Sequence, residues 1–277
     1  MALVPFPNQA PERLPQDDPE LEQEDSDLEL SEAGGKMSFL EHLDELRKRI
    51  IRAVIAVGIG FLIACFYIQQ LFDFIMKPLQ ALLPEGGTLV YTDPTEAFVL
   101  YIKIAAIAGL LIASPAVMTQ VWLFIAPGLY ANEKKLAIPF VLMSTFFFLA
   151  GAAFSHYVVF PMTWQFFVSF TTDTLSFLPR IEPTFSLYMK MILAFGLVFQ
   201  MPTVVLFLAR MGVVTARFLW RNIKYAILVI FIIAAVVTPS ADMVTQVAMA
   251  GPMILLYLLS IGLAWMFGKK EEQLESS

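Results

Sequence analysis

Apolar residues are arranged along this chain in long runs separated by short polar segments. A hydrocarbon core about 30 Å thick requires roughly 20 apolar residues in a spanning helix, so runs of this length predict membrane spans. We identify six, at about residues 51–68, 97–116, 138–160, 187–209, 225–237 and 247–267. The fifth has only thirteen residues, which rise about 20 Å as a helix. The pattern predicts an all-α, polytopic membrane protein with six transmembrane helices.

The packing of these helices is indicated by prolines and glycines. Pro115, Pro202 and Pro252 lie inside predicted helices. Each lacks a backbone N–H, so we expect the helix to kink or end there. Gly58 and Gly60 in the first span indicate a close contact between helices. We therefore expect a kinked bundle with a concave face rather than straight, parallel helices.

Basic residues in the connections predict the orientation, because Lys and Arg accumulate on the cytoplasmic side of membrane proteins. Thirteen basic residues fall on one predicted side, and four fall in the opposite connections or within spans. The four are Lys77, Lys103, Arg180 and Lys190. Both termini are therefore expected in the cytoplasm.

Composition agrees with a membrane protein and separates a tail from it. Hydrophobic residues make up 58% of the 277-residue chain, more than a soluble domain normally contains. The net charge of −6 is uneven, because residues 1–35 hold ten acidic residues and a single arginine. Such a segment is expected to be disordered. We predict an acidic tail at 1–35, a membrane domain at 36–268 and a short cytoplasmic tail at 269–277.

Enzymatic chemistry is not indicated by any motif. Cys65 is the only cysteine, which excludes an intramolecular disulfide and a thiolate metal cluster. The two histidines, His42 and His156, are too few for a conventional histidine metal site. The chain contains neither an HExxH motif nor a P-loop. We therefore expect no enzyme activity, no metal and no cofactor.

The segment Ser38–Ile50 is a charged, amphipathic stretch that leads into the first span. Ser38 and Glu41 form a capping-box pattern, and apolar residues recur every three or four positions, which predicts a helix. Two acid–base pairs are spaced i, i+4 on its polar side: Asp44–Lys48 and Glu45–Arg49. The basic residues are explained by their role in setting the orientation of the protein in the membrane, whereas the acidic residues have no such explanation. The simplest interpretation is a set of surface pairs, and the alternative is a site for a cation.

A second acid, Glu133, lies in the connection FIAPGLYANEKK after the second span. A single glutamate in a loop is usually only solvated. Two acids on separate cytoplasmic elements would instead make a paired carboxylate site for a cationic ligand. Arginine is the best matched partner, because its planar guanidinium group binds carboxylates through two hydrogen bonds.

Four ordered segments resemble the signature segments of the TatC family, the core receptor of the twin-arginine protein translocase. They are HLDELRKRI, QVWLFIAPGLYANEKK, FGLVFQMP and TPSAD. The resemblance covers about residues 38–267. It implies a component of the cytoplasmic (inner) membrane that binds folded cargo proteins through twin-arginine signal peptides. It also implies single-span partners of the TatA and TatB types, and transport driven by the proton-motive force. We expect contact with membrane lipids, leave self-association open and expect no nucleic acid.

The resemblance also assigns residues to roles. Glu45 and Glu133 match the acids that recognise twin arginines in the family, and three neighbours match their motifs: Arg47, Phe124 and Tyr130. Structural or partner-contact roles are implied for four further positions: Pro78, Pro127, Gln200 and Asp242. Gln200 stands where the family commonly has glutamate, and an amide can form hydrogen bonds but cannot titrate.

A different class of function stays open at this point. A secondary transporter of a small solute would use broken helices and intramembrane polar residues, here Lys103, Lys190 and Gln200. Against it, the spans show no evident internal repeat, and acids within the spans are lacking. A passive assembly anchor is a third alternative.

Overall fold

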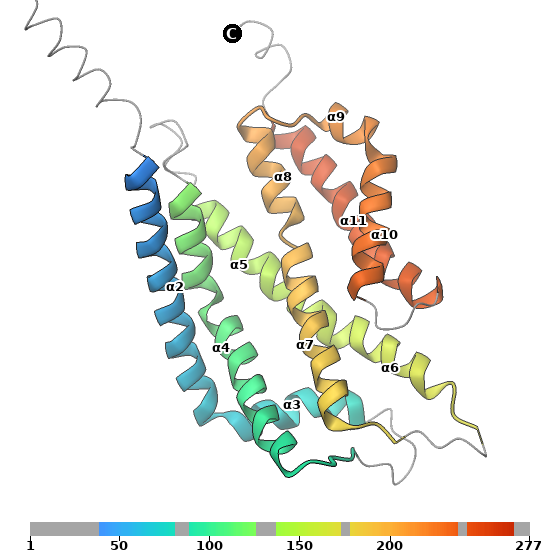
Figure 1. Ribbon diagram of the computed structural model, residues 1–277. Helices are drawn as coiled ribbons and strands as arrows, with labels where there is room; N and C mark the ends of the chain where they lie inside the picture. Colours follow the sequence, from blue (N-terminus) through green and yellow to red (C-terminus); the bar gives the residue numbers. More distant parts are fainter. Residues whose placement is uncertain (1–38, 81–88, 126–136, 173–177, 238–242, 269–277) are drawn as a thin grey trace, which may run out of the picture. The chain divides into compact units, whose positions relative to one another are not determined.

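The computed structural model describes residues 39–80, 89–125, 137–172, 178–237 and 243–268, and most of these residues are helical (Figure 1). The chain divides after Lys48 into two units, each of which is described by itself. The elements are α2 (Phe39–Phe66), α3 (Ile68–Gln80), α4 (Pro94–Ile125), α5 (Ala137–Phe154), the π-helix η3 (Ser155–Val159), α6 (Phe160–Val168), α7 (Ile181–Val198), α8 (Met201–Arg210), α9 (Ala216–Arg221), α10 (Ile223–Val237) and α11 (Met243–Phe267).

The predicted spans correspond to helical segments of the described chain. Five are long and apolar enough to cross a membrane: His42–Phe66, Pro94–Ile125, Ile138–Val168, Ile181–Arg210 and Thr245–Phe267. The short fifth span is α10, whose 15 residues rise about 22 Å. The prediction of an all-α, six-span membrane protein is therefore confirmed.

Three helical segments extend beyond the predicted spans. The second helix runs from Pro94 to Ile125, the third helical segment continues to Val168, and the fourth begins at Ile181. Hydropathy ends a span where polar or charged residues begin, whereas the helices continue through them. The parts of the chain between the first and second predicted spans and between the third and fourth are consequently partly helical: they include most of α3 and most of α6.

The prolines act in two ways. The ring of Pro202 conflicts with a helical carbonyl four residues earlier, and α7 ends at that residue, Val198, before α8 begins at Met201. The expected break is confirmed there. Helix α4 instead continues through Pro115. The missing N–H of Pro115 would have bonded to the Leu111 carbonyl, which accepts the hydroxyl hydrogen of Ser114 over 2.8 Å. This bond satisfies the carbonyl within the membrane. Helix α11 likewise contains Pro252 without ending.

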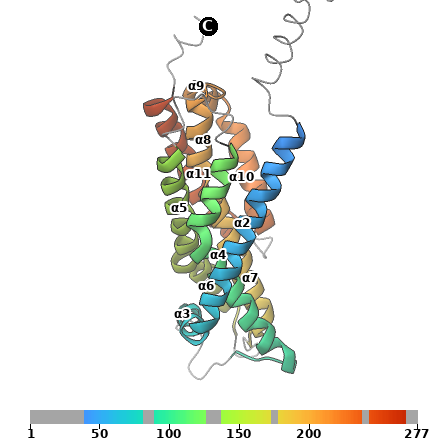
Figure 2. The same ribbon diagram turned by 90° about the vertical axis from the view of Figure 1, so that its left-hand side faces the viewer.

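Two ends of the larger unit are distinct in Figures 1 and 2: α3 lies across one end, and α9 lies at the other. We call the α9 end the basic end, because α8, α9 and α10 contribute Arg210, Arg217, Arg221 and Lys224 there. The α3 end is called the cap end. The segments that precede α4 and α7 meet there, since Val90 and Arg180 form a parallel backbone bridge.

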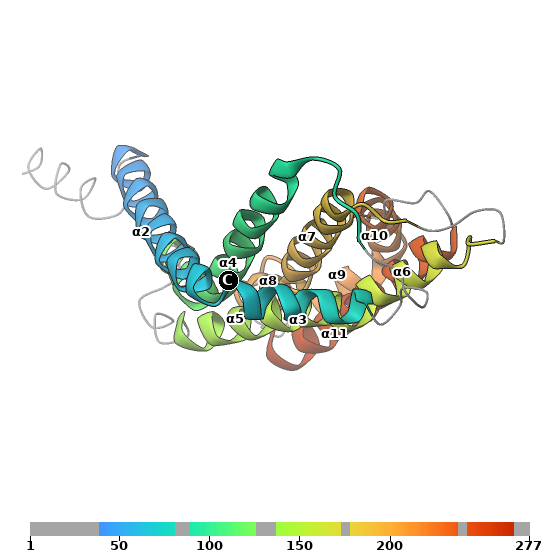
Figure 3. The same cartoon turned by 90° about the horizontal axis from the view of Figure 1, so that it is seen from below.

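The core of the larger unit is rich in aromatic side chains. Seen from the cap end, α4, α7 and α10 lie along one side, and α5, α6 and α11 lie along the other (Figure 3). Phe160, Phe185 and Phe195 are almost completely buried in the main cluster between them. This packing fixes one face of α7 in the core.

One of the two glycines in the first span makes the predicted close contact. A Cβ atom on Gly60 would overlap the carbonyl oxygen of Gly109 in α4, and one on Gly109 would lie 2.5 Å from the Phe61 nitrogen. Ala64, Ala105 and other small residues extend this contact. Gly58 has no atom within 4 Å of such a Cβ, so the prediction was wrong for that residue.

Candidate functional site

The predicted site residues divide into those that the structure describes and those that it does not. Glu45, Arg47, Pro78 and Phe124 lie in described helices, and Gln200 lies between α7 and α8. Glu133, Pro127, Tyr130 and Asp242 lie outside the described residues, as do the acidic tail (1–35) and the C-terminal tail (269–277). The pairing of Glu45 with Glu133 therefore stays a prediction.

The smaller unit contains the charged start of α2. Lys48 and Asp44 form the predicted i, i+4 ion pair with a separation of 3.6 Å, and both side chains are mostly exposed. An exposed pair of this kind contributes little stability. Glu45 is half-buried, and Arg47 is exposed. The Glu45 carboxylate is therefore more shielded from solvent than its charged neighbours.

At the basic end of the larger unit, α2 and α4 are joined by polar side chains. Arg49 Nη1 donates a hydrogen bond to Gln120 Oε1 over 3.4 Å. Phe124 is half-buried in the last turn of α4. The segment with Glu133 connects the end of α4 at Ile125 to the start of α5 at Ala137. The contact from Arg49 thus fixes α2 to the part of α4 from which that segment begins.

Gln200 belongs to a chain of hydrogen bonds across three helices. Its Nε2 donates to the backbone carbonyl of Ser144 in α5 over 2.8 Å. The Ser144 hydroxyl accepts a 2.6 Å hydrogen bond from Trp122 Nε1 of α4. The Trp122 ring stacks on Phe140 and meets the edge of Phe207. The amide of Gln200 therefore binds the break between α7 and α8 to α5. This contact requires a hydrogen-bond donor, because its partner is a carbonyl oxygen.

Two ion pairs join α4 to the start of α7 at the cap end. Arg180 Nη2 lies 2.6 Å from Glu96 Oε1, and Lys103 Nζ lies 2.8 Å from Glu182 Oε1. We call them the cap-end ion pairs. The sequence indicated no acids within the spans, which was wrong, because α7 begins early enough to include Glu182. The hydropathy profile does not indicate that Lys103 pairs with Glu182. The one available signal is the isolated charge of Lys103 within an apolar run, which requires a partner.

Asp93 and Thr95 cap the beginning of α4. The Asp93 carboxylate accepts hydrogen bonds from the Thr95 hydroxyl over 2.7 Å and from the Thr95 backbone N–H over 2.8 Å. These two bonds, the side-chain bond first, hold the pKa of Asp93 below its usual range. The cap fixes the first turn of α4, where Glu96 receives Arg180.

Pro78 and His156 occupy structural positions near the cap end. Pro78 is half-buried in the last turn of α3. His156 is buried in the π-helix, with its Nδ1 3.0 Å from the Tyr188 hydroxyl and its ring stacked on Phe74. These contacts give His156 a packing role. Within the described part of the chain, no group of three His, Cys, Asp or Glu side chains is arranged to hold a metal ion.

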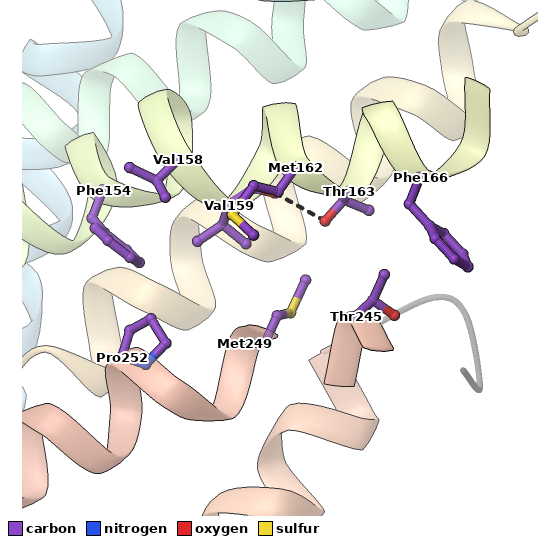
Figure 4. A pocket seen from close by; sticks show the side chains of 9 residues that line it. All are labelled: Phe154, Val158, Val159, Met162, Thr163, Phe166, Thr245, Met249 and Pro252. Atoms are coloured by element: carbon purple, nitrogen blue, oxygen red, sulfur yellow. Dashed lines mark hydrogen bonds between the residues drawn. The ribbon is translucent and has the colours of Figure 1, made fainter. Parts of the chain in front are cut away.

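A pocket of about 110 Å³ lies between the third helical segment and α11 (Figure 4). Phe154, Met162, Met249 and Pro252 line it with apolar atoms. The Thr163 hydroxyl in its wall is already bonded to the Val159 carbonyl over 2.9 Å. Such a space suits an apolar group, since an engineered apolar cavity of about 150 Å³ binds benzene. It offers no carboxylate for an arginine.

Known proteins match this chain over most of its length. Residues 41–252 match the model of the family TatC, Sec-independent protein translocase protein. The Sec-independent protein translocase protein TatC of Desulforapulum autotrophicum is 45% identical over 237 residues, which cover 86% of this chain and 87% of the relative. The TatC protein of Koribacter versatilis is 44% identical over 240 residues, which cover 86% of this chain and 88% of the relative.

A solved structure agrees with these sequence matches. The crystal structure of the twin-arginine translocase receptor TatC in DDM superposes with a TM-score of 0.73 at 37% identity, covering 83% of this chain and all of that chain. The fold, the order of the helices and the extended sequence identity lead to one conclusion. The chain belongs to the TatC family and is a multi-pass membrane component of the Sec-independent, twin-arginine protein translocase.

Proposed function

We propose that this chain is the signal-peptide receptor of a twin-arginine translocase that exports folded proteins across the inner membrane. The supporting observation is its membership of the TatC family, together with its likeness to a solved twin-arginine translocase receptor. In this proposal both termini are cytoplasmic, as the distribution of Lys and Arg predicts. Single-span proteins of the TatA and TatB types assemble with the chain, and the proton-motive force drives transport.

The proposed recognition site uses Glu45 and Glu133, with Arg47, Phe124 and Tyr130 as neighbours. A half-buried carboxylate such as that of Glu45 interacts more strongly with a cation than a fully solvated one does. Two adjacent arginines of a signal peptide each bring a planar guanidinium group that matches a carboxylate. Each charge-assisted hydrogen bond contributes about 1.5–3 kcal/mol. The apolar stretch of the peptide supplies much of the remaining affinity through burial.

Equilibrium binding of a synthetic twin-arginine signal peptide to the purified chain in nanodiscs tests this proposal. Glu45→Gln and Glu133→Gln each remove one charge at nearly constant volume. We expect each to weaken binding by roughly 10- to 100-fold, which corresponds to about 1.5–3 kcal/mol. Asp44→Asn is the matched control, because Asp44 lies on the same helix and pairs with Lys48 on its exposed side.

The control variant should bind like the unmodified protein, and a peptide with two lysines should bind less tightly than the twin-arginine peptide. Unchanged affinity in the double variant Glu45→Gln/Glu133→Gln would reject the site. The alternative of a small-solute transporter receives no support from the relatives, which are protein translocase components.

A further inference from the structure

Lys103 and Glu182 form an ion pair between two helical segments that are long and apolar enough to cross a membrane. Lys103 lies in the span Pro94–Ile125, and Glu182 lies in the span Ile181–Arg210. Their charged atoms are 2.8 Å apart, and the side chains remain 30% and 41% exposed. Partial exposure of both charges raises the question of which medium they face, because hydrocarbon solvates neither of them.

The hydrogen bonds around this pair are incomplete. A lysine ammonium group has three donors, and Lys103 uses two, toward Glu182 Oε1 and toward Ser186 Oγ at 3.4 Å. Ser186 donates to the same Glu182 oxygen over 2.8 Å. Among the described residues, Glu182 Oε2 accepts no hydrogen bond, and the third Lys103 donor has no acceptor. Glu182 thus retains a free hydrogen-bond acceptor and Lys103 a free donor, and both require a partner outside the described chain.

The second cap-end ion pair continues this polar surface toward the end of the bundle. Glu96 receives Arg180, and its carboxylate also accepts hydrogen bonds from the backbone and the hydroxyl of Thr92. The seven residues from Glu96 to Lys103 span about 10 Å along α4. A strip of charged and hydroxyl groups therefore runs inward from the cap end, between α4 and α7.

We propose that this strip lines a water-filled recess, which enters the membrane domain from the cap end and reaches Lys103 and Ser186. Unsatisfied polar groups cost several kcal/mol each in hydrocarbon, whereas a bridging water replaces a direct hydrogen bond at little cost. Charged side chains within spans normally face the bundle interior or a water-filled cavity. Water is the occupant that supplies both a donor for Glu182 Oε2 and an acceptor for Lys103.

Reaction of single cysteines with a permanently charged thiosulfonate reagent tests the recess in lipid nanodiscs, where both faces are accessible. The background is Cys65→Ser, because Cys65 is exposed. Ser186→Cys introduces the thiol in the proposed recess, five residues from the start of α7. Leu62→Cys is the matched control: Leu62 lies four residues from the end of α2 and is 60% exposed on an apolar face.

We expect Ser186→Cys to react at least about tenfold faster than Leu62→Cys, because the reactive thiolate forms in water and not in an apolar environment. Lys103→Cys provides a second probe of the same recess, in which the reagent also restores the positive charge. A rate at both recess positions no higher than at position 62 would overturn the proposal. The result does not depend on signal-peptide binding, so it leaves the proposed receptor function to its own test.

Discussion

The contact between Gly60 and Gly109 allows a prediction with an internal control. Gly60→Ala places a methyl group against the Gly109 carbonyl, and the backbone there cannot rotate away. Since the methyl carbon would overlap the Gly109 carbonyl oxygen, α2 and α4 must separate by roughly 1 Å to restore van der Waals contact. Forcing an extra methyl group into a packed contact costs about 1–3 kcal/mol. The separation also loosens the small-residue contact around Ala64 and Ala105.

Thermal unfolding of the purified chain in detergent, followed by tryptophan fluorescence, measures this cost. We expect Gly60→Ala to lower Tm by about 2–12 °C, using roughly 2–4 °C per kcal/mol for a chain of this size. Gly58→Ala is the control on the same helix, because its new methyl group meets no atom within 4 Å. It should leave Tm unchanged or raise it, since alanine stabilises a helix by about 1 kcal/mol relative to glycine. Equal Tm values for the two variants would refute the assigned contact.

Three further variants test individual contacts. Trp122→Phe removes the donor to Ser144 but keeps the aromatic packing. We expect the free energy of unfolding, measured by thermal denaturation, to fall by about 0.5–1.5 kcal/mol. An unchanged free energy would show that the bond contributes nothing to stability. Gln200→Glu places a carboxylate opposite the Ser144 carbonyl, so only its protonated form can donate. Its Tm deficit should therefore grow from pH 5 to pH 8, and a pH-independent deficit would contradict the hydrogen bond. Asp93→Asn should speed hydrogen exchange of the Thr95 amide at neutral pH. The carboxylate has a lowered pKa, so its contribution is present above the ordinary value of 3.8 and is lost as the pH falls through the lower folded value; a difference that persists after protonation would refute the cap.

Much of the fold could be predicted because lipid imposes a strict rule on apolar length. Each apolar run became a helix, and the short fifth span was recognised from thirteen residues alone. The helix ends were less accurate, since hydropathy ends a span where polar or charged residues begin, whereas a helix can continue through them. Glu182 was excluded from the fourth span for this reason, although Lys103 stabilises it within the helix.

Contacts between helices were less accessible from the sequence. Pro202 correctly predicted a break. Helix α4 instead continues through Pro115, where the Ser114 hydroxyl donates to the Leu111 carbonyl. The presence of a proline alone does not predict this local hydrogen bond. Gly58 and Gly60 look alike in the sequence, and only the position of α4 distinguishes them. Periodicity and charge favoured ordinary surface pairs and left a paired carboxylate site as the alternative, and the family resemblance then assigned arginine recognition to Glu45 and Glu133.

Photocrosslinking tests the central claim, arginine recognition by two acids, most directly. A photoreactive amino acid introduced at position 45 or 133 would report contact with a twin-arginine signal peptide bound to the chain in its native membrane. We predict crosslinks from both positions to the segment around the two arginines, strongly reduced when these are replaced by lysines. Crosslinks from position 44 at equal or greater yield, or none from positions 45 and 133, would contradict the claim.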